Sequence, residues 1–122
     1  MSIPTYGSLQ NNYNSEYRCN HATQLKKNWD QSTCLMHYVE QSDGSYAIQN
    51  VHNNQYFDSS ITTMSDSVSG DSQKWRLLAV SDVTNGYYVQ NVKNSEFMTS
   101  HASQLSTGAG KKEVWIIEEK SQ

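Results

Sequence analysis

The chain has 122 residues and a formal net charge of −3, and only 35% of its residues are hydrophobic. This length favours one domain with a modest core. Lysine and arginine are scattered, with adjacent pairs only at Lys26-Lys27 and Lys111-Lys112, which argues against the concentrated basic surface that nucleic-acid binding requires. No stretch is long and apolar enough for membrane insertion.

An internal repeat organises the sequence. Asn14–Leu25 has a near-copy at Asn94–Leu105, and seven of the twelve positions are identical. A weaker copy begins at Asn53, where the asparagine and the following aromatic residue recur in register. Similarity at a fixed spacing indicates a repeat architecture. It predicts a single domain over residues 1–122, built from three units of about 40 residues at roughly 5–43, 44–84 and 85–122.

Each unit contains short strand signals rather than long helical ones. The first unit offers a weak match at Leu9–Asn12, while Tyr46–Gln49 and Tyr87–Gln90 alternate apolar and polar residues, as half-buried strands do. Turn signals punctuate these strands at Asp43-Gly44, Ser69–Asp71, Asn85-Gly86 and Gly108–Gly110. No apolar stripe with a period of 3.6 residues is present, so long helices are not expected.

Three four-stranded units predict an all-β fold with pseudo-three-fold symmetry, the β-trefoil. A propeller blade also has four strands in a similar length, but propellers typically need at least about four blades to close. The trefoil is therefore favoured.

The core is expected at apolar positions that recur from unit to unit. A residue present in every unit is there for packing, whereas a bulky residue found in one unit is a better candidate for function. The expected core positions are Leu9, Ile48 and Val89; Tyr17, Tyr56 and Phe97; Leu25, Met64 and Leu105; and Met36, Trp75 and Trp115.

The two cysteines both lie in the first unit. A secreted domain stapled by disulfides usually has more cysteine, and the N-terminal residues show no basic start followed by an apolar run. We therefore expect a cytoplasmic protein with Cys19 and Cys34 as reduced thiols, while a single bridge between them stays open.

The strand Gly44–Val51, its counterpart Gly86–Val92 and the Gln73-Lys74-Trp75 motif resemble the ricin-B-like β-trefoil lectins, especially the small cytoplasmic ones of fungi. Those chains repeat such a strand and close each unit with Gln-x-Trp. The motif is altered at Glu113–Trp115 and missing from the first unit, where Thr33–Met36 stands. The resemblance implies a glycan-binding protein with a role in defence.

In that family, sugar binding uses an aspartate early in the unit, an aromatic platform, and an Asn or Gln near Gln-x-Trp. Asp58 matches the aspartate in the second unit, whereas Cys19 and Thr99 stand at the equivalent positions. The segment between Asp58 and Trp75 contains no aromatic residue. Asp58 is accordingly a candidate site residue, but its unit lacks the aromatic residue on which a sugar would stack.

Trp29 occurs in one unit only, within a polar segment. Its flat apolar face suits the C–H face of a pyranose, and the adjacent Asn28 and Asp30 can hydrogen-bond to hydroxyl groups. The alternative is that Trp29 folds back and fills the space left by the missing tryptophan at Met36.

His21 and His101 share a repeat position, and Gln24 and Gln104 follow each of them by three residues. This pattern predicts two equivalent polar sites for glycans, with simple turn-stabilising residues as the alternative. No cluster of His, Cys or carboxylate residues has the spacing of metal ligands, so no metal site is predicted.

The function expected from these features is non-catalytic recognition of glycans at shallow sites, with no cofactor. Weak single sites would gain avidity from several sites per chain or from a homodimer. No catalytic motif supports an enzyme. Two alternatives on the same scaffold are a protease inhibitor acting through the Lys26–Ser32 or Ser65–Ser72 loop and an actin-binding or other protein-interaction trefoil.

Overall fold

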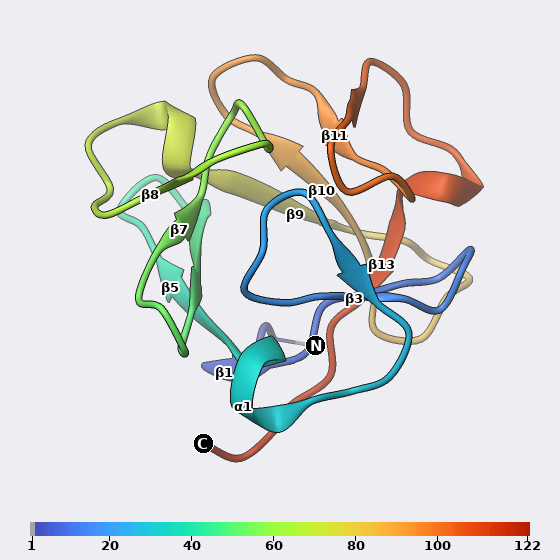
Figure 1. Ribbon diagram of the computed structural model, residues 1–122. Coiled ribbons are helices and arrows are strands. Elements are labelled where there is room, and N and C mark those ends of the chain that lie inside the picture. Colours follow the sequence, from blue (N-terminus) through green and yellow to red (C-terminus); the bar gives the residue numbers. More distant parts are fainter. Residues whose placement is uncertain (1) are drawn as a thin grey trace.

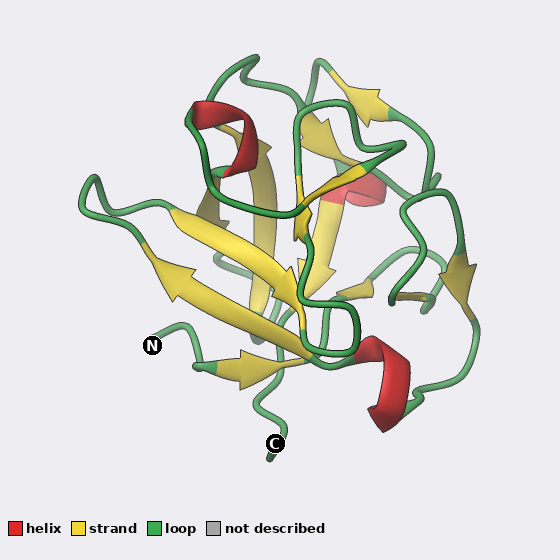
Figure 2. Cartoon of the chain, turned by 60° about the vertical axis from the view of Figure 1, so that its left-hand side comes forward, coloured by secondary structure: helices red, strands yellow, loops and turns green. Residues whose placement is uncertain are grey.

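The computed structural model describes residues 2–122, and nearly all of its regular structure is β-strand. Figure 2 shows the helical segments as short turns between strands and loops. In chain order the elements are β1 (Tyr6–Gly7), β2 (Gln10–Asn11), β3 (Tyr17–Arg18), β4 (Leu25–Lys26), α1 (Gln31–Cys34), β5 (Met36–Glu40), β6 (Tyr46–Asn50), β7 (Tyr56–Phe57), β8 (Met64–Ser65), η1 (Asp71–Gln73), β9 (Trp75–Ala79), β10 (Gly86–Asn91), β11 (Phe97–Met98), β12 (Leu105–Ser106), η2 (Lys111–Glu113) and β13 (Val114–Ile116).

The first and last strands of the three units form a closed ring. The hydrogen-bonded order is β1-β5-β6-β9-β10-β13-β2, and β1 and β2 are the two ends of the first unit's opening strand, separated by Ser8 and Leu9. All of these pairs are antiparallel. Closure leaves the barrel without a free edge.

Three short hairpins branch from this barrel, one in each unit. They are β3–β4, β7–β8 and β11–β12, and they pair with β2, β6 and β10 respectively. Figure 1 shows β3, β7 and β11 spread around the centre of the molecule. A six-stranded barrel with three equivalent hairpins is a β-trefoil, so the predicted fold class is confirmed.

The core lies along the pseudo-three-fold axis. Two layers follow the prediction, because Leu9, Ile48 and Val89, and likewise Met36, Trp75 and Trp115, are fully buried. Leu25, Met64 and Leu105 are only partly buried and pack against the outside of this cluster.

One predicted layer was wrong by one residue. Tyr17, Tyr56 and Phe97 are half-buried, while the next residue of each strand points inward and is fully buried. These inward residues are Arg18, Phe57 and Met98. Successive side chains of a strand face opposite sides, so a shift of one residue exchanges the two faces.

A buried asparagine ends the opening strand of each unit. The side-chain amides of Asn11, Asn50 and Asn91 donate to backbone carbonyls just before the closing strand of a unit, at 2.9, 2.8 and 2.9 Å. Each side-chain oxygen also accepts from the backbone N–H groups of the second and third residues that follow. These bonds fix the turn that leads to each hairpin.

None of the helices in residues 2–122 has the length and apolar character needed to cross a membrane.

Candidate functional site

The ricin-type aspartate position can be followed through the three units. Cys19, Asp58 and Thr99 come directly after β3, β7 and β11. Their partners lie two residues before the buried Met36, Trp75 and Trp115, at Cys34, Gln73 and Glu113. The same two positions are joined by a different chemical link in each unit.

In the first unit this link is covalent. Cys19 and Cys34 form a disulfide, so the expectation of two reduced thiols was wrong. Both cysteines are buried. The bridge fills the place where the second unit has its aspartate, so the first unit offers no carboxylate at this position.

In the second unit Asp58 is engaged by its own hairpin. One carboxylate oxygen accepts from the backbone N–H of Ser60 at 3.0 Å and from its hydroxyl at 2.7 Å, and the other accepts from the Ser65 hydroxyl at 2.6 Å. Gln73 donates to the same Ser65 hydroxyl at 3.3 Å. Asp58 is only 9% exposed, whereas Ser60 and Thr63 of the same hairpin are exposed residues whose hydroxyls hydrogen-bond to each other at 2.8 Å.

In the third unit the link is a hydrogen bond between buried side chains. The Thr99 hydroxyl donates to Glu113 at 2.5 Å, and Glu113 accepts a second bond from the backbone N–H of Gly110 at 2.7 Å. This carboxylate is thus used to close the unit.

Trp29 lies on the surface of the first unit, half-buried and outside the core cluster. Its ring packs against Tyr17, with ring centres 5.5 Å apart and planes tilted by 60°. The ammonium group of Lys120 stands 5.2 Å from the Trp29 ring centre. Trp29 does not fill a gap at Met36, because Met36 itself occupies that core position.

Asp30, beside Trp29, caps α1. Its carboxylate accepts from the Ser32 backbone at 3.1 Å, the Ser32 and Thr33 hydroxyls at 2.8 Å each, and the Lys26 ammonium at 3.3 Å. The hydrogen bond from the Ser32 side chain is the main reason that the pKa of Asp30 falls to about 2, followed by that from Thr33. Asn28 is exposed and, within residues 2–122, its side chain has no hydrogen-bond partner.

The structure brings the His21 and His101 turns together. The guanidinium of Arg18 donates to the carbonyl of Ala22 and to that of Ala102, at 2.8 Å each. Asn14 adds a bond to the carbonyl of Ser100 at 3.0 Å. Both histidines, with Gln24 and Gln104, are exposed. The second unit breaks the pattern, because Ile61 replaces the alanine and is buried.

Arg18 is the largest departure from the sequence-based prediction. Its guanidinium is fully buried between the rings of Phe57 and Trp115, at 5.5 and 5.9 Å from their centres. In the described chain the guanidinium donates only to the carbonyls of Ala22 and Ala102. Burial lowers the pKa of Arg18 to about 9. The repeat alignment could have predicted this burial, because it places Arg18 at the position of Phe57 and Met98. The prediction was missed because Tyr17 was chosen as the inward residue.

The candidates come from all three units. The first unit holds Trp29, Asn28, Asp30, His21 and Gln24, and the turn of His101 and Gln104 in the third unit is linked to it by Asn14 and Arg18. The Asp58 hairpin of the second unit is linked to the third, because the Asn94 side chain donates to the Ser59 carbonyl at 3.5 Å. Tyr17, which completes the aromatic surface with Trp29, was not among the predicted site residues.

The sequence matches no known family model and no curated protein. Solved structures do match. A designed three-fold symmetric protein, ThreeFoil, shares 13% identity at a TM-score of 0.80, with 95% of this chain and 99% of that chain covered. SeviL, solved with the asialo-GM1 saccharide bound, shares 16% identity at a TM-score of 0.77, covering 98% of this chain and 100% of that one. The BEL β-trefoil, solved without ligand, shares 12% identity at a TM-score of 0.74, covering 97% and 94%. These similarities independently show that the chain has the β-trefoil fold.

Proposed function

We propose that this protein binds glycans without changing them chemically, and that its principal site is the aromatic surface formed by Trp29 and Tyr17. One observation carries the proposal. Trp29 occurs in a single unit and stays at the surface, held by Tyr17 and Lys120 rather than by the core.

An aromatic face at the surface offers an apolar plane to the C–H groups of a sugar ring. Polar groups next to the plane fix the orientation of the sugar through its hydroxyls. Asn28 and Gln24 are exposed and supply amide donors and acceptors for this purpose, and His21 adds an imidazole. Asp30 contributes indirectly, because its carboxylate already holds α1 and Lys26 in place.

The comparisons support this class of function without assigning it. SeviL, whose structure contains the asialo-GM1 saccharide, shows that a trefoil of similar size can hold a glycan. The kinship with ricin-B-like lectins stays part of the proposal. In this chain the Gln73-Lys74-Trp75 motif serves the fold, since the indole of Trp75 donates to the Phe57 carbonyl at 3.0 Å.

Binding at one such site is expected to be weak, because hydrogen bonds to sugar hydroxyls replace bonds to water and gain little net free energy. The Asp58 surface and the His101 turn are secondary candidate sites. We propose that no cofactor takes part and that avidity comes from more than one site or from a homodimer.

A cytoplasmic location stays a prediction. Disulfides persist mainly in oxidising compartments, so the Cys19–Cys34 bridge is the feature to follow in cells. Because both cysteines are buried, the cells are lysed directly into denaturant with an alkylating agent. Alkylation of both cysteines would then support the cytoplasmic location, and resistance to alkylation would count against it.

The direct test is a multivalent glycan array probed with the wild-type protein, with Trp29→Ala and with Leu78→Ala. Leu78 is a matched control, because it is an exposed apolar residue, 41% accessible, in another unit. We expect a family of related glycans to bind the wild type and Leu78→Ala, and the signal to fall at least about tenfold in Trp29→Ala, equivalent to 1.4 kcal/mol. Equal binding by all three proteins would refute the Trp29 site, and a blank array would turn attention to protease inhibition.

A further inference from the structure

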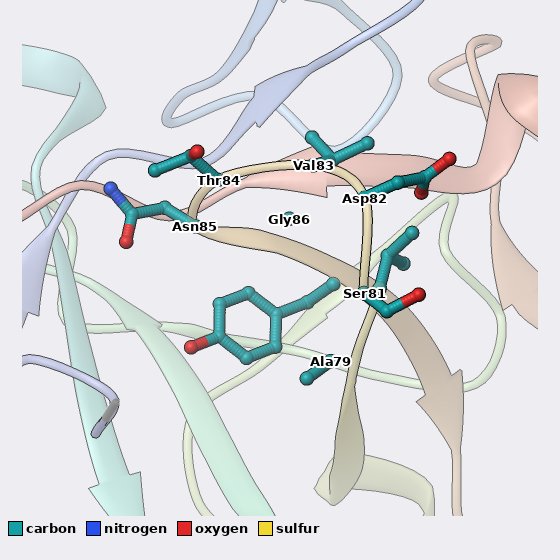
Figure 3. A pocket seen from close by; sticks show the side chains of 9 residues that line it. Ala79, Ser81, Asp82, Val83, Thr84, Asn85 and Gly86 are labelled. Carbon is teal, nitrogen blue, oxygen red and sulfur yellow. The ribbon is translucent and has the colours of Figure 1, made fainter.

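A hollow lies at the turn between β9 and β10, away from all the candidates above. Residues 79–87 surround a volume of about 430 Å³. Figure 3 looks onto it: Gly86 is at the centre, Thr84 and Asn85 are on one side, and Ser81 and Asp82 are on the other. A Cβ atom at Gly86 would come within 2.7 Å of the Val83 side chain, so glycine is required here for the turn to pack closely against the start of β10.

The turn is held in shape by its own backbone. The N–H of Gly86 donates to the carbonyl of Val83 at 2.9 Å, and the N–H of Val80 donates to the carbonyl of Gly86 at 2.9 Å. The carbonyl of Asn85 also accepts from the backbone of Ile117, next to β13, at 3.0 Å. Because the rim is anchored to the barrel, a ligand would not have to order a flexible loop.

Asp82 differs from the other aspartates of the chain. Asp30, Asp43 and Asp58 accept bonds from serines close in sequence, Asp66 accepts from Gln55, and Asp71 pairs with Lys74. In the described chain only Asp82 has neither a hydrogen bond nor an ion pair, and it is exposed on the rim of the hollow. Its four acceptor positions are therefore available to a ligand.

The remaining rim combines polar and apolar groups. Ser81, Thr84 and Asn85 supply two hydroxyls and a carboxamide, and none of these side chains makes a hydrogen bond within residues 2–122. Val80, Val83 and Tyr87 supply apolar surface beside them. A hollow with a few polar groups on an apolar lining is typical of small-ligand sites.

We propose that this hollow is a second ligand site, which takes a neutral terminal saccharide through its hydroxyl groups. Asp82 accepts from two neighbouring hydroxyls, Asn85 donates and accepts on the opposite side, and the apolar rim contacts the C–H groups of the ring. The choice of a sugar as ligand rests on the proposed function. The location of the site is independent of Trp29 and its neighbours.

Two other ligands fit the rim less well. Calcium takes about six to eight oxygen ligands, commonly with several carboxylates, and this rim has one carboxylate. A basic side chain of a protein partner would pair with Asp82 but would leave the hydroxyls and the apolar rim unused. A titration with lysine amide distinguishes this basic partner from a sugar.

The test is a titration followed by amide NMR shifts, with methyl glycosides of galactose, glucose, mannose and N-acetylglucosamine as probes and lysine amide as a cationic control. The proteins are wild type, Asp82→Ala, Asp66→Ala and Trp29→Ala. Asp66 is a matched exposed aspartate outside the hollow. We expect one glycoside to shift the amides of residues 80–87 with a Kd on the order of 1 mM, weakened at least about tenfold in Asp82→Ala and unchanged in the other two variants.

The place of the shifts separates this inference from the proposed function. Shifts confined to residues 17–30 would overturn the second site and leave the Trp29 site standing, and shifts confined to residues 80–87 would do the reverse. The second site is also overturned if no glycoside shifts residues 80–87, if Asp82→Ala responds like the wild type, or if lysine amide shifts these amides as strongly as any sugar.

Discussion

Arg18 places a cation where the other two units place Phe57 and Met98. A charge buried without a carboxylate loses most of its hydration, and two carbonyl bonds and two aromatic faces compensate only in part. The lowered pKa of Arg18 has the same cause, since burial disfavours the charged form. What the residue contributes in return is a direct link between the first and third units.

The Arg18→Met variant measures whether the cost of burying this charge exceeds the gain from the link, because methionine is the residue at the equivalent position, Met98, of the third unit. We expect the free energy of unfolding to rise by about 1–2 kcal/mol, as in other replacements of buried ions by apolar residues. Arg18→Ala is the control and should lower it by about 2–4 kcal/mol through a cavity. If denaturant melts show Arg18→Met to be as unstable as Arg18→Ala, the link between the units outweighs the cost of burial.

Asp30 gives a prediction on pH. Its folded pKa of about 2 lies below the ordinary value of 3.8, so its contribution to stability is fully present above pH 4 and is lost as the pH falls toward 2. Side-chain carboxyl NMR should show a midpoint near 2 for Asp30. Because the Ser32 hydroxyl is the largest cause, Ser32→Ala should raise this midpoint toward the ordinary value. An unchanged midpoint would mean that the cap does not depend on that hydroxyl.

For single residues, the sequence indicated which positions recur in the three units, but it did not indicate which side chains face the core. β3, β7 and β11 have two residues each, and a two-residue strand carries no alternation from which to read its inward face. The aromatic residue was the natural choice for the core, whereas the structure buries its neighbour. Whether the predicted site residues bind glycans is a question of geometry and affinity that no pattern in the sequence answers.

Among the elements, the closure of each unit shows the most variation. Equivalent positions are joined in three different ways. The first unit uses the Cys19–Cys34 disulfide, and the third uses a single hydrogen bond between Thr99 and Glu113. The second unit uses a hydrogen-bonded chain from Asp58 through Ser65 to Gln73. Repeat alignment already placed Cys19, Asp58 and Thr99 in one register. It also aligned Gln73 with Glu113. The first unit has Thr33–Met36 in place of the Gln-x-Trp motif, so Cys34 was not recognised as the counterpart of these residues and the bridge stayed open.

The first unit should depend on its bridge. A disulfide that closes a loop of 15 residues is worth about 3 kcal/mol in the chain-entropy account. We expect Cys19→Ser combined with Cys34→Ser to lower the free energy of unfolding by about 2–4 kcal/mol in denaturant melts. Thr99→Ala, which removes the corresponding bond of the third unit, should cost about 1–3 kcal/mol because it leaves part of buried Glu113 without a donor. A smaller loss in the double cysteine variant than in Thr99→Ala would contradict this order.

For the whole molecule, the three-fold repeat was the decisive signal in the sequence. Three units of about 40 residues with short strands specify a closed barrel, because each unit can bury its apolar face only against the other two. The long-range pairing of β10 with β13 and of β13 with β2 follows from this closure. The β9–β10 hollow did not follow, because it depends on how a six-residue turn, Val80–Asn85, folds over Gly86.

Two separate sites on one chain would make the monomer bivalent. Trp29 lies beside the β3–β4 hairpin and Asp82 in the β9–β10 turn, so one molecule could hold two glycans presented on different surfaces. Vesicles that display the strongest glycan of the array should therefore aggregate with the wild type, as dynamic light scattering can follow. Trp29→Ala and Asp82→Ala should each still bind vesicles but no longer aggregate them, since bridging needs both sites. If either single variant still aggregates vesicles, the remaining valence comes from the Asp58 surface, the His101 turn or a homodimer, and sedimentation of the same samples would reveal the dimer.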